Sequence, residues 1–216
     1  MSSSQSPIVR REQPRIATSS FVTFLIGKDE EKFVVHKDFV CYSSPALNAA
    51  FNNDRFEETN NLTYKIVDAS LEAFEYFAQF IYSQRVEVPS DVQASNGTDN
   101  FATLAELWIL GDRFLMPKLQ NQAIKAIWEL SDITATVPTN IFHYVYENTV
   151  FGSQLRHLMI SFCVLDLTVQ EIGDEVDDFP KELLLDTLQV DITLMCPDRC
   201  IDYQFERHIS DFEVPE

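Results

Sequence analysis

Two short hydrophobic runs near the start of the chain constrain its fold most strongly. Residues 21–26, FVTFLI, are β-branched and aromatic, and Gly27 ends the run. A charged turn at 28–31 separates them from a second run, KFVV, at 32–35. This pattern predicts a β-hairpin. Two strands alone are only marginally stable in water, so the hairpin has to be covered by other elements.

The remaining sequence supplies mainly helices for that purpose. A short helical segment is expected at 39–41, and Ser44 and Pro45 suit the N-cap and first position of the next helix. Helical periodicity predicts further helices over residues 71–82, 101–114, 117–130, 139–148, 152–167 and 179–189, and short strands over 62–67 and 86–88. The order of elements indicates an α+β protein with a small sheet and many helices.

The apolar positions of these helices define the expected core. Ser70 is expected to cap the helix that carries Phe74 and Phe77. In the two following helices, one face is expected to hold Leu104, Trp108 and Leu115, and the other Leu119, Ala123, Ile127 and Leu130. Tyr76 and Phe80 belong either to the core stripe or to a partner surface, and core packing is the favoured interpretation.

Composition excludes several classes of function. The 216 residues carry a net charge of −18, which repels nucleic acid and anionic lipid headgroups. Only 5 glycines argue against a glycine-rich phosphate loop. The first 20 residues lack the apolar core of a signal peptide, and no apolar run reaches the roughly 18 residues of a membrane span. The four scattered cysteines then favour a reducing compartment, the cytoplasm or the nucleus.

Two groups of residues suggest chemistry. His36, Cys41, Ser43 and Ser44 lie close together in sequence, as in a cysteine or serine hydrolase. No G-x-S-x-G elbow accompanies them, so structural roles are favoured. Cys196, Cys200 and His208, with Cys163 or an aspartate as a fourth ligand, suggest a zinc site. Their spacing is not that of a standard knuckle, so ordinary thiols are favoured and no cofactor is expected.

Several stretches in order resemble the BTB/POZ domain over about residues 20–132. They are FVTFLIG, KFVVHKDFVCYSSPALNAAF, RFEETNNLTYKIVDASLEAFEYFAQFIYSQRVEV and LAELWILGDRFLMPKLQNQAIKAI. The signature positions that match the family are Phe33, His36, Ser44, Pro45, Phe74 and Tyr82, together with Phe56 and Glu57. The sequence of these stretches is most similar to that of the stand-alone BTB proteins of filamentous fungi.

The chain is expected to divide into three parts. Residues 1–18 are polar and serine-rich and are expected to form a disordered N-terminal arm. The resemblance places the BTB/POZ domain at 19–132, and 133–216 is expected to form an acidic C-terminal helical extension. The extension is the expected place for a partner surface, starting with Tyr144, Tyr146, Leu155 and Leu158. The favoured alternative is that these four side chains pack the extension onto the domain.

The resemblance also implies protein–protein interaction as the function, with no enzymatic activity. Many family members associate through the first strand and first helices, and many carry substrates to cullin-RING ubiquitin ligases through a φ-x-E segment. Here that segment matches Ala50, Phe51 and Asn52, and Phe56-Glu57 gives a shifted acidic pattern nearby. The missing acid and bulky apolar residue are expected to cost about 2–5 kcal/mol of cullin binding. The alternative is an oligomerisation scaffold or transcription-associated partner without cullin binding.

A homodimer is a further expectation from the resemblance. Dimeric members often exchange a strand that precedes the first strand of the hairpin. Ile8-Val9 is the only apolar pair before Ile16. A strand-exchanged dimer is therefore less favoured than an unswapped dimer or a monomer.

Overall fold

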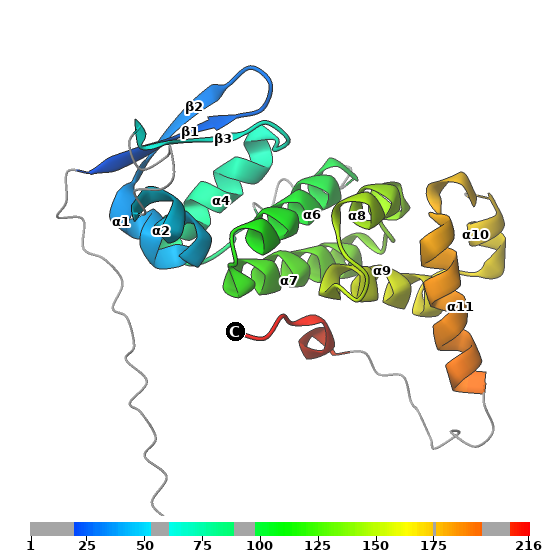
Figure 1. The fold of residues 1–216 in the computed structure, drawn as a ribbon. Helices are drawn as coiled ribbons and strands as arrows, with labels where there is room; N and C mark the ends of the chain where they lie inside the picture. Colours follow the sequence, from blue (N-terminus) through cyan, green and yellow to red (C-terminus); the bar gives the residue numbers. More distant parts are fainter. Residues whose placement is uncertain (1–19, 53–60, 89–97, 175, 196–207) are drawn as a thin grey trace, which may run out of the picture.

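Three short strands form one small sheet. The computed structural model describes residues 20–52, 61–88, 98–174, 176–195 and 208–216. Strand β1 (Phe21–Ile26) pairs antiparallel with β2 (Glu31–His36) and parallel with β3 (Thr63–Ile66), so β1 lies in the middle (Figure 1). The expected hairpin is therefore confirmed.

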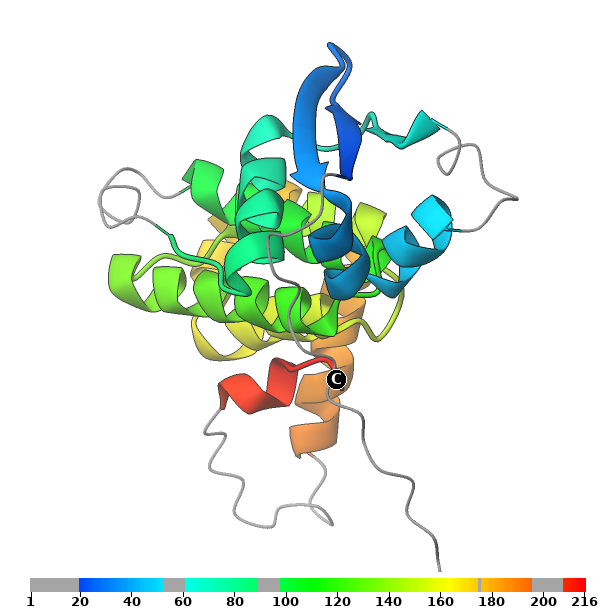
Figure 2. The same cartoon turned by 90° about the vertical axis from the view of Figure 1, so that its left-hand side faces the viewer.

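Helices make up most of the remaining described structure. In chain order they are α1 (Lys37–Ser43), α2 (Pro45–Asn52), α4 (Leu71–Ser83), α6 (Thr98–Arg113), α7 (Pro117–Thr134), α8 (Phe142–Asn148), α9 (Gln154–Leu165), α10 (Val169–Asp174) and α11 (Lys181–Met195), with 3₁₀ turns η1 (Thr139–Ile141), η2 (Val176–Asp178) and η4 (Ile209–Phe212). Helices α1, α2 and α4 lie next to the sheet, α6 and α7 follow, and α9 to α11 lie farthest from it (Figures 1 and 2). The α+β class is confirmed.

The inner face of the sheet packs on α4 through aromatic rings. Along β1 every second side chain is buried, and Val22, Phe24 and Ile26 are fully inaccessible to solvent. The Phe24 ring centroid lies 5.1 Å from that of Phe74 in α4, and Phe33 from β2 lies 4.8 Å from the same ring. Burying each such side chain contributes about 1.5–3 kcal/mol, so this contact couples the sheet to the helices.

Ser44 joins two distant parts of the domain. Its hydroxyl accepts a hydrogen bond from the Leu47 backbone N–H (3.0 Å), which caps α2. The same hydroxyl donates to the backbone oxygen of Phe114 (2.7 Å), just beyond α6, and the residue is fully buried. Pro45 occupies the first position of α2, as expected. Ser70 caps α4 in the same way by accepting from the Ala73 N–H.

The expected strand at 86–88 is wrong, because side-chain amides satisfy this backbone in place of a neighbouring strand. The Val86 N–H donates to the side-chain oxygen of Gln122 (2.6 Å), and the Gln122 amide donates to the Gln84 carbonyl (2.9 Å). Both bonds come from α7, so the segment runs along that helix without pairing to the sheet.

The helix boundaries around α6 also differ from expectation. The helix begins at Thr98, three residues early, and ends at Arg113. Leu115 then adopts a left-handed backbone with φ of 54° and is 60 % exposed, whereas Leu104 and Trp108 are buried. Helical periodicity does not apply past the end of the helix, which is why the expected burial of Leu115 is wrong.

The extension packs on itself and shares one hydrophobic cluster with the domain. Tyr146, Leu155 and Leu158 are buried, so their side chains belong to packing within the chain; Tyr144 is half-buried. The Arg156 guanidinium lies 4.3 Å from the centroid of the Tyr146 ring, and the Tyr146 hydroxyl donates to Asp186 (3.0 Å). These contacts link α8, α9 and α11.

Replacing Ser44 with alanine is expected to destabilise the protein by about 2–3 kcal/mol. The change removes the cap of α2 and leaves the buried Phe114 oxygen without this donor. Urea denaturation followed by circular dichroism measures the loss. Ser43→Ala is the matched control, because the Ser43 hydroxyl only accepts from the Gln84 side chain in a half-buried position. Equal losses in both variants would contradict the assigned role of Ser44.

Candidate functional site

His36 and Tyr82 meet where the sheet passes into the helices. The His36 backbone N–H donates to the Tyr82 hydroxyl (3.1 Å), and the His36 Nδ1 atom lies 3.0 Å from the same oxygen. Since the hydroxyl accepts from the backbone, its own proton can go to Nδ1. One tyrosine at the end of α4 thereby holds both the main chain and the imidazole of the residue that precedes α1.

Further rings gather around this pair. The Phe21 ring lies 4.6 Å from the His36 ring, and Phe39 of α1 lies 5.2 Å from Tyr82. Phe39 is buried, but Phe21 is 44 % exposed and Tyr82 is 36 % exposed. We call Phe21, His36, Phe39 and Tyr82 the aromatic corner. Its residues come from β1, β2, α1 and α4, and its exposed aromatic surface is that of Phe21 and Tyr82.

The residues that suggested a hydrolase are occupied by structural contacts. The Ser44 hydroxyl is buried between Leu47 and Phe114, as described above. Burial raises the pKa of the Cys41 thiol, which disfavours the nucleophilic thiolate. The His36 imidazole faces Tyr82. These contacts give no arrangement of nucleophile and base among the described residues of this region.

The three residues that match the φ-x-E segment differ in exposure. Phe51 is fully buried, with its ring centroid 6.0 Å from that of Phe24, so its side chain packs the core and is not available to a partner. Ala50 is half-buried. Asn52 is exposed on the last turn of α2, and its amide donates to the Asn48 side chain (2.9 Å). Phe56 and Glu57 lie outside the described residues.

The suggested zinc ligands are only partly within the described structure. Cys196 and Cys200 lie outside it. His208 is exposed, and its backbone N–H donates to Asp211 (3.0 Å). Cys163 is buried, which raises the pKa of its thiol to about 12. Within the described ranges no three metal-binding side chains come together.

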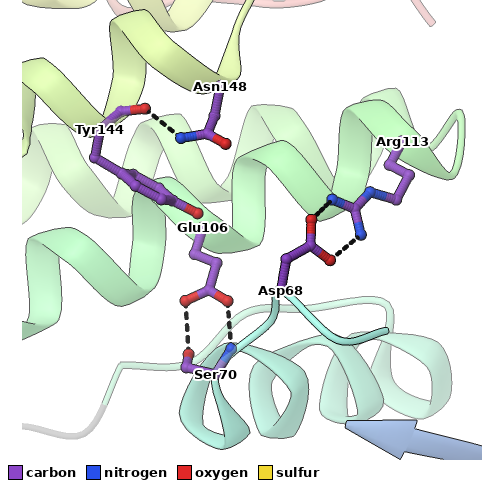
Figure 3. Close-up of polar contacts among 6 residues, drawn as sticks. All are labelled: Asp68, Ser70, Glu106, Arg113, Tyr144 and Asn148. Atoms are coloured by element: carbon purple, nitrogen blue, oxygen red, sulfur yellow. Dashed lines mark hydrogen bonds and ion pairs between the residues drawn. The ribbon is translucent and has the colours of Figure 1, made fainter. Parts of the chain in front are cut away.

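A polar joint connects the end of β3 to α6, and the sequence alone did not indicate it. The Arg113 guanidinium forms a two-pronged ion pair with Asp68, and the Glu106 carboxylate accepts from both the N–H and the hydroxyl of Ser70 (Figure 3). The Tyr144 ring of α8 points toward Glu106. Burial, followed by the negative charges of Glu106 and Asp68, raises the pKa of Tyr144 to about 12.

A groove of about 830 Å³ opens between α4 and α6, beside this joint. Its lining includes the glutamates Glu72, Glu75, Glu87 and Glu106. A surface of this charge disfavours phosphate or nucleic acid as a ligand. The groove also contains Tyr76, which is half-buried, whereas Phe80 is buried in the core.

Comparison with known proteins identifies the domain that carries these features. The family model of the BTB/POZ domain matches residues 17–129, more than half of the chain. The chain belongs to the BTB/POZ domain family. BTB/POZ domains mediate protein–protein interactions, so the coarse function is that of an interaction module.

Two further comparisons complete this result. Among solved structures, the chain is similar to the BTB (Tramtrack and Bric a brac) domain of human gigaxonin, with a TM-score of 0.35 and 15% sequence identity over 49% of this chain and 75% of that chain. No curated protein gives a significant match. Within its described part, the chain contains no helix that is both long and apolar enough to cross a bilayer.

The ion pair at the polar joint predicts a pH-dependent contribution to stability. Arg113 holds the pKa of the Asp68 carboxyl below its usual range. Stabilisation from this pair is therefore present above the unfolded-state pKa and is lost as the pH falls through the lower, folded-state pKa. Because both side chains are partly exposed, the contribution is at most about 1 kcal/mol.

The measurement compares wild type with Asp68→Asn in urea at pH 7 and again near pH 3. The difference in free energy of unfolding should shrink as the pH falls. Glu30→Gln is a matched control, since Glu30 pairs with Lys65 on the exposed end of the sheet. A difference for Asp68→Asn that stays constant over this range would contradict the assignment.

Proposed function

We propose that this BTB/POZ chain associates with a second protein chain through the aromatic corner, and that the second chain is another copy of itself. The observation that carries the proposal is the partial exposure of two aromatic side chains, Phe21 and Tyr82, that gather on His36 at one corner of the domain. Aromatic side chains are enriched at the centres of protein interfaces and often dominate their binding energy.

Neighbouring side chains extend this surface. Val34 lies on the same face of the sheet as Phe21 and His36, because β1 and β2 pair Phe21 with His36 and Thr23 with Val34. Val34 is 54 % exposed. The surface therefore continues from the end of α4 onto β2, and this supports association through the first strand and first helices.

Electrostatics make self-association dependent on salt. Two copies with a net charge of −18 repel each other at long range, and added salt screens this repulsion. An apolar contact at the aromatic corner does not depend on ion pairs. Association should therefore become tighter between low and moderate ionic strength.

Phe21→Glu is expected to weaken self-association by at least about tenfold, as the loss of a central aromatic anchor does. Sedimentation equilibrium at two ionic strengths measures the dissociation constant. Phe151→Glu is the matched control, because Phe151 is 80 % exposed on the loop between α8 and α9. A wild-type chain that stays monomeric at high concentration, or an equal effect of both substitutions, would argue against the aromatic corner.

The second candidate is a substrate adaptor for a cullin-RING ubiquitin ligase. Exposure of Asn52 at the end of α2 supports a docking surface there. Burial of Phe51 and the absence of an acid at position 52 weigh against tight docking. Phe51→Ala is unsuitable as a probe, because it removes a ring from the core.

Asn52→Glu provides a sharper test of the adaptor function. Restoring the acid adds a charge-assisted hydrogen bond of about 1.5–3 kcal/mol, so the variant should bind a BTB-binding cullin at least about tenfold more tightly than wild type. Calorimetric titration with the cullin N-terminal region measures both. Asn48→Glu, one turn earlier on α2, is the control. If wild type and both variants fail to bind the cullin, the adaptor function is excluded and self-association is the remaining proposal.

We also propose a relationship to fungal BTB proteins and a boundary between the domain and the extension. The similarity to stand-alone BTB proteins of filamentous fungi rests on the sequence stretches quoted above. The boundary between the domain and the extension, placed at 132/133, falls in the last turn of α7, which ends at Thr134.

A further inference from the structure

The C-terminal segment, residues 208–216, packs against α7 and α9. Its 3₁₀ turn η4 contacts both helices. Phe212 is 6 % exposed, and its ring centroid lies 5.8 Å from that of Trp128 in α7. In both views the segment lies beside α7, well removed in sequence from that helix (Figures 1 and 2).

The surface of α7 that receives the segment is distinct from its core face. Leu119, Ala123, Ile127 and Leu130 point into the hydrophobic core. Lys118, Asn121, Lys125 and Trp128 follow the spacing i, i+3, i+7 and i+10, which places them along a different stripe of the helix. We call Lys118, Asn121 and Trp128 the docking stripe.

Asn121 recognises the main chain of the segment. Its side-chain oxygen accepts from the Val214 N–H (2.6 Å), and its side-chain amide donates to the Val214 carbonyl (3.0 Å). One side chain thus pairs both backbone groups of one residue, as an adjacent β-strand does in peptide recognition. This bond pair accepts any residue with a free backbone N–H at the position of Val214.

Alternate residues of the segment contact the docking stripe. Phe212 contacts Trp128, Val214 is held at Asn121, and Glu216 lies 3.8 Å from Lys118. The segment therefore runs antiparallel to α7, with every second residue directed at one member of the docking stripe. Glu213 and Pro215, between them, are exposed.

Hydrogen bonding within the segment shapes its first turn. The Asp211 carboxylate accepts from the His208 N–H (3.0 Å), and the turn η4 follows. A peptide constrained in this way loses less conformational entropy on binding.

We propose that the docking stripe is a peptide-binding site for an acidic partner segment of the form Phe-x-aliphatic-x-acidic, and that residues 208–216 occupy it in cis. The phenylalanine ring packs on Trp128 in a tilted arrangement, the next-but-one residue pairs its backbone with Asn121, and the acid two residues further meets Lys118. A partner segment with this chemistry competes with residues 208–216 for the docking stripe. The site lies outside the aromatic corner and does not depend on the function proposed for it.

The test uses the full chain and a fluorescein-labelled peptide with the sequence of residues 208–216, HISDFEVPE. Fluorescence anisotropy measures its binding to wild type, to Phe212→Ala and to Phe212→Ala combined with Asn121→Ala. A tethered segment acts at an effective concentration on the order of millimolar, so a peptide dissociation constant of about 100 µM should rise about tenfold in wild type. Phe212→Ala should bind more tightly than wild type, and the double variant should not bind.

A second variant of the segment and a control peptide complete the test. Val214→Pro in the full chain removes the backbone N–H that donates to Asn121, and it keeps the Phe212 side chain in contact with Trp128. This variant provides a second way to weaken cis docking if Phe212→Ala does not fold. A labelled peptide with alanine in place of phenylalanine is the control ligand. Equal peptide affinity for wild type and for the single variants Phe212→Ala and Val214→Pro would overturn the proposal. So would the absence of peptide binding to these single variants once they are shown to be folded, or peptide binding that survives Asn121→Ala.

Discussion

Burial of the β1 side chains against α4 is the contact on which the rest of the structure depends. A two-stranded hairpin is only marginally stable in water, and packing of a sheet against a helix is one way to stabilise it. The Phe24 ring is packed among Phe51, Phe74 and Phe77, which come from α2 and α4, and this ties the sheet to the helices. Two further contacts connect α6 to the sheet and its helices. Ser44 bonds to Phe114 just beyond α6, and the polar joint bonds α6 to the segment between β3 and α4.

The aromatic corner is a consequence of the same packing. The start of β1, the end of β2 and the end of α4 converge because the sheet lies along the helix, and Tyr82 then bonds both the backbone and the imidazole of His36. Phe39 is buried there, whereas Phe21 and Tyr82 are partly exposed, so the packing that stabilises the domain also leaves aromatic surface at its edge. In a chain with a net charge of −18, such a surface favours contacts with other proteins over contacts with nucleic acid.

Local patterns in the sequence predicted much of this fold and only part of the candidate sites. The hairpin, the caps Ser44 and Ser70 and the core face of α7 were predicted correctly, because alternation, helical periodicity and capping act over a few residues. The strand expected at 86–88 and the burial of Leu115 were wrong, since a distant glutamine and a helix end decided those positions. The polar joint was not predicted.

The sequence by itself determined the hairpin and most of the helices, where several of them begin, and that the chain is acidic. Tertiary structure decided that Phe51 packs the core, that Tyr82 bonds to His36 and that Asn121 holds Val214. The last two contacts join residues 46 and 93 positions apart. The physical reason is that periodicity and capping depend on immediate neighbours, whereas such pairings depend on how whole elements pack, and no local pattern contains that information.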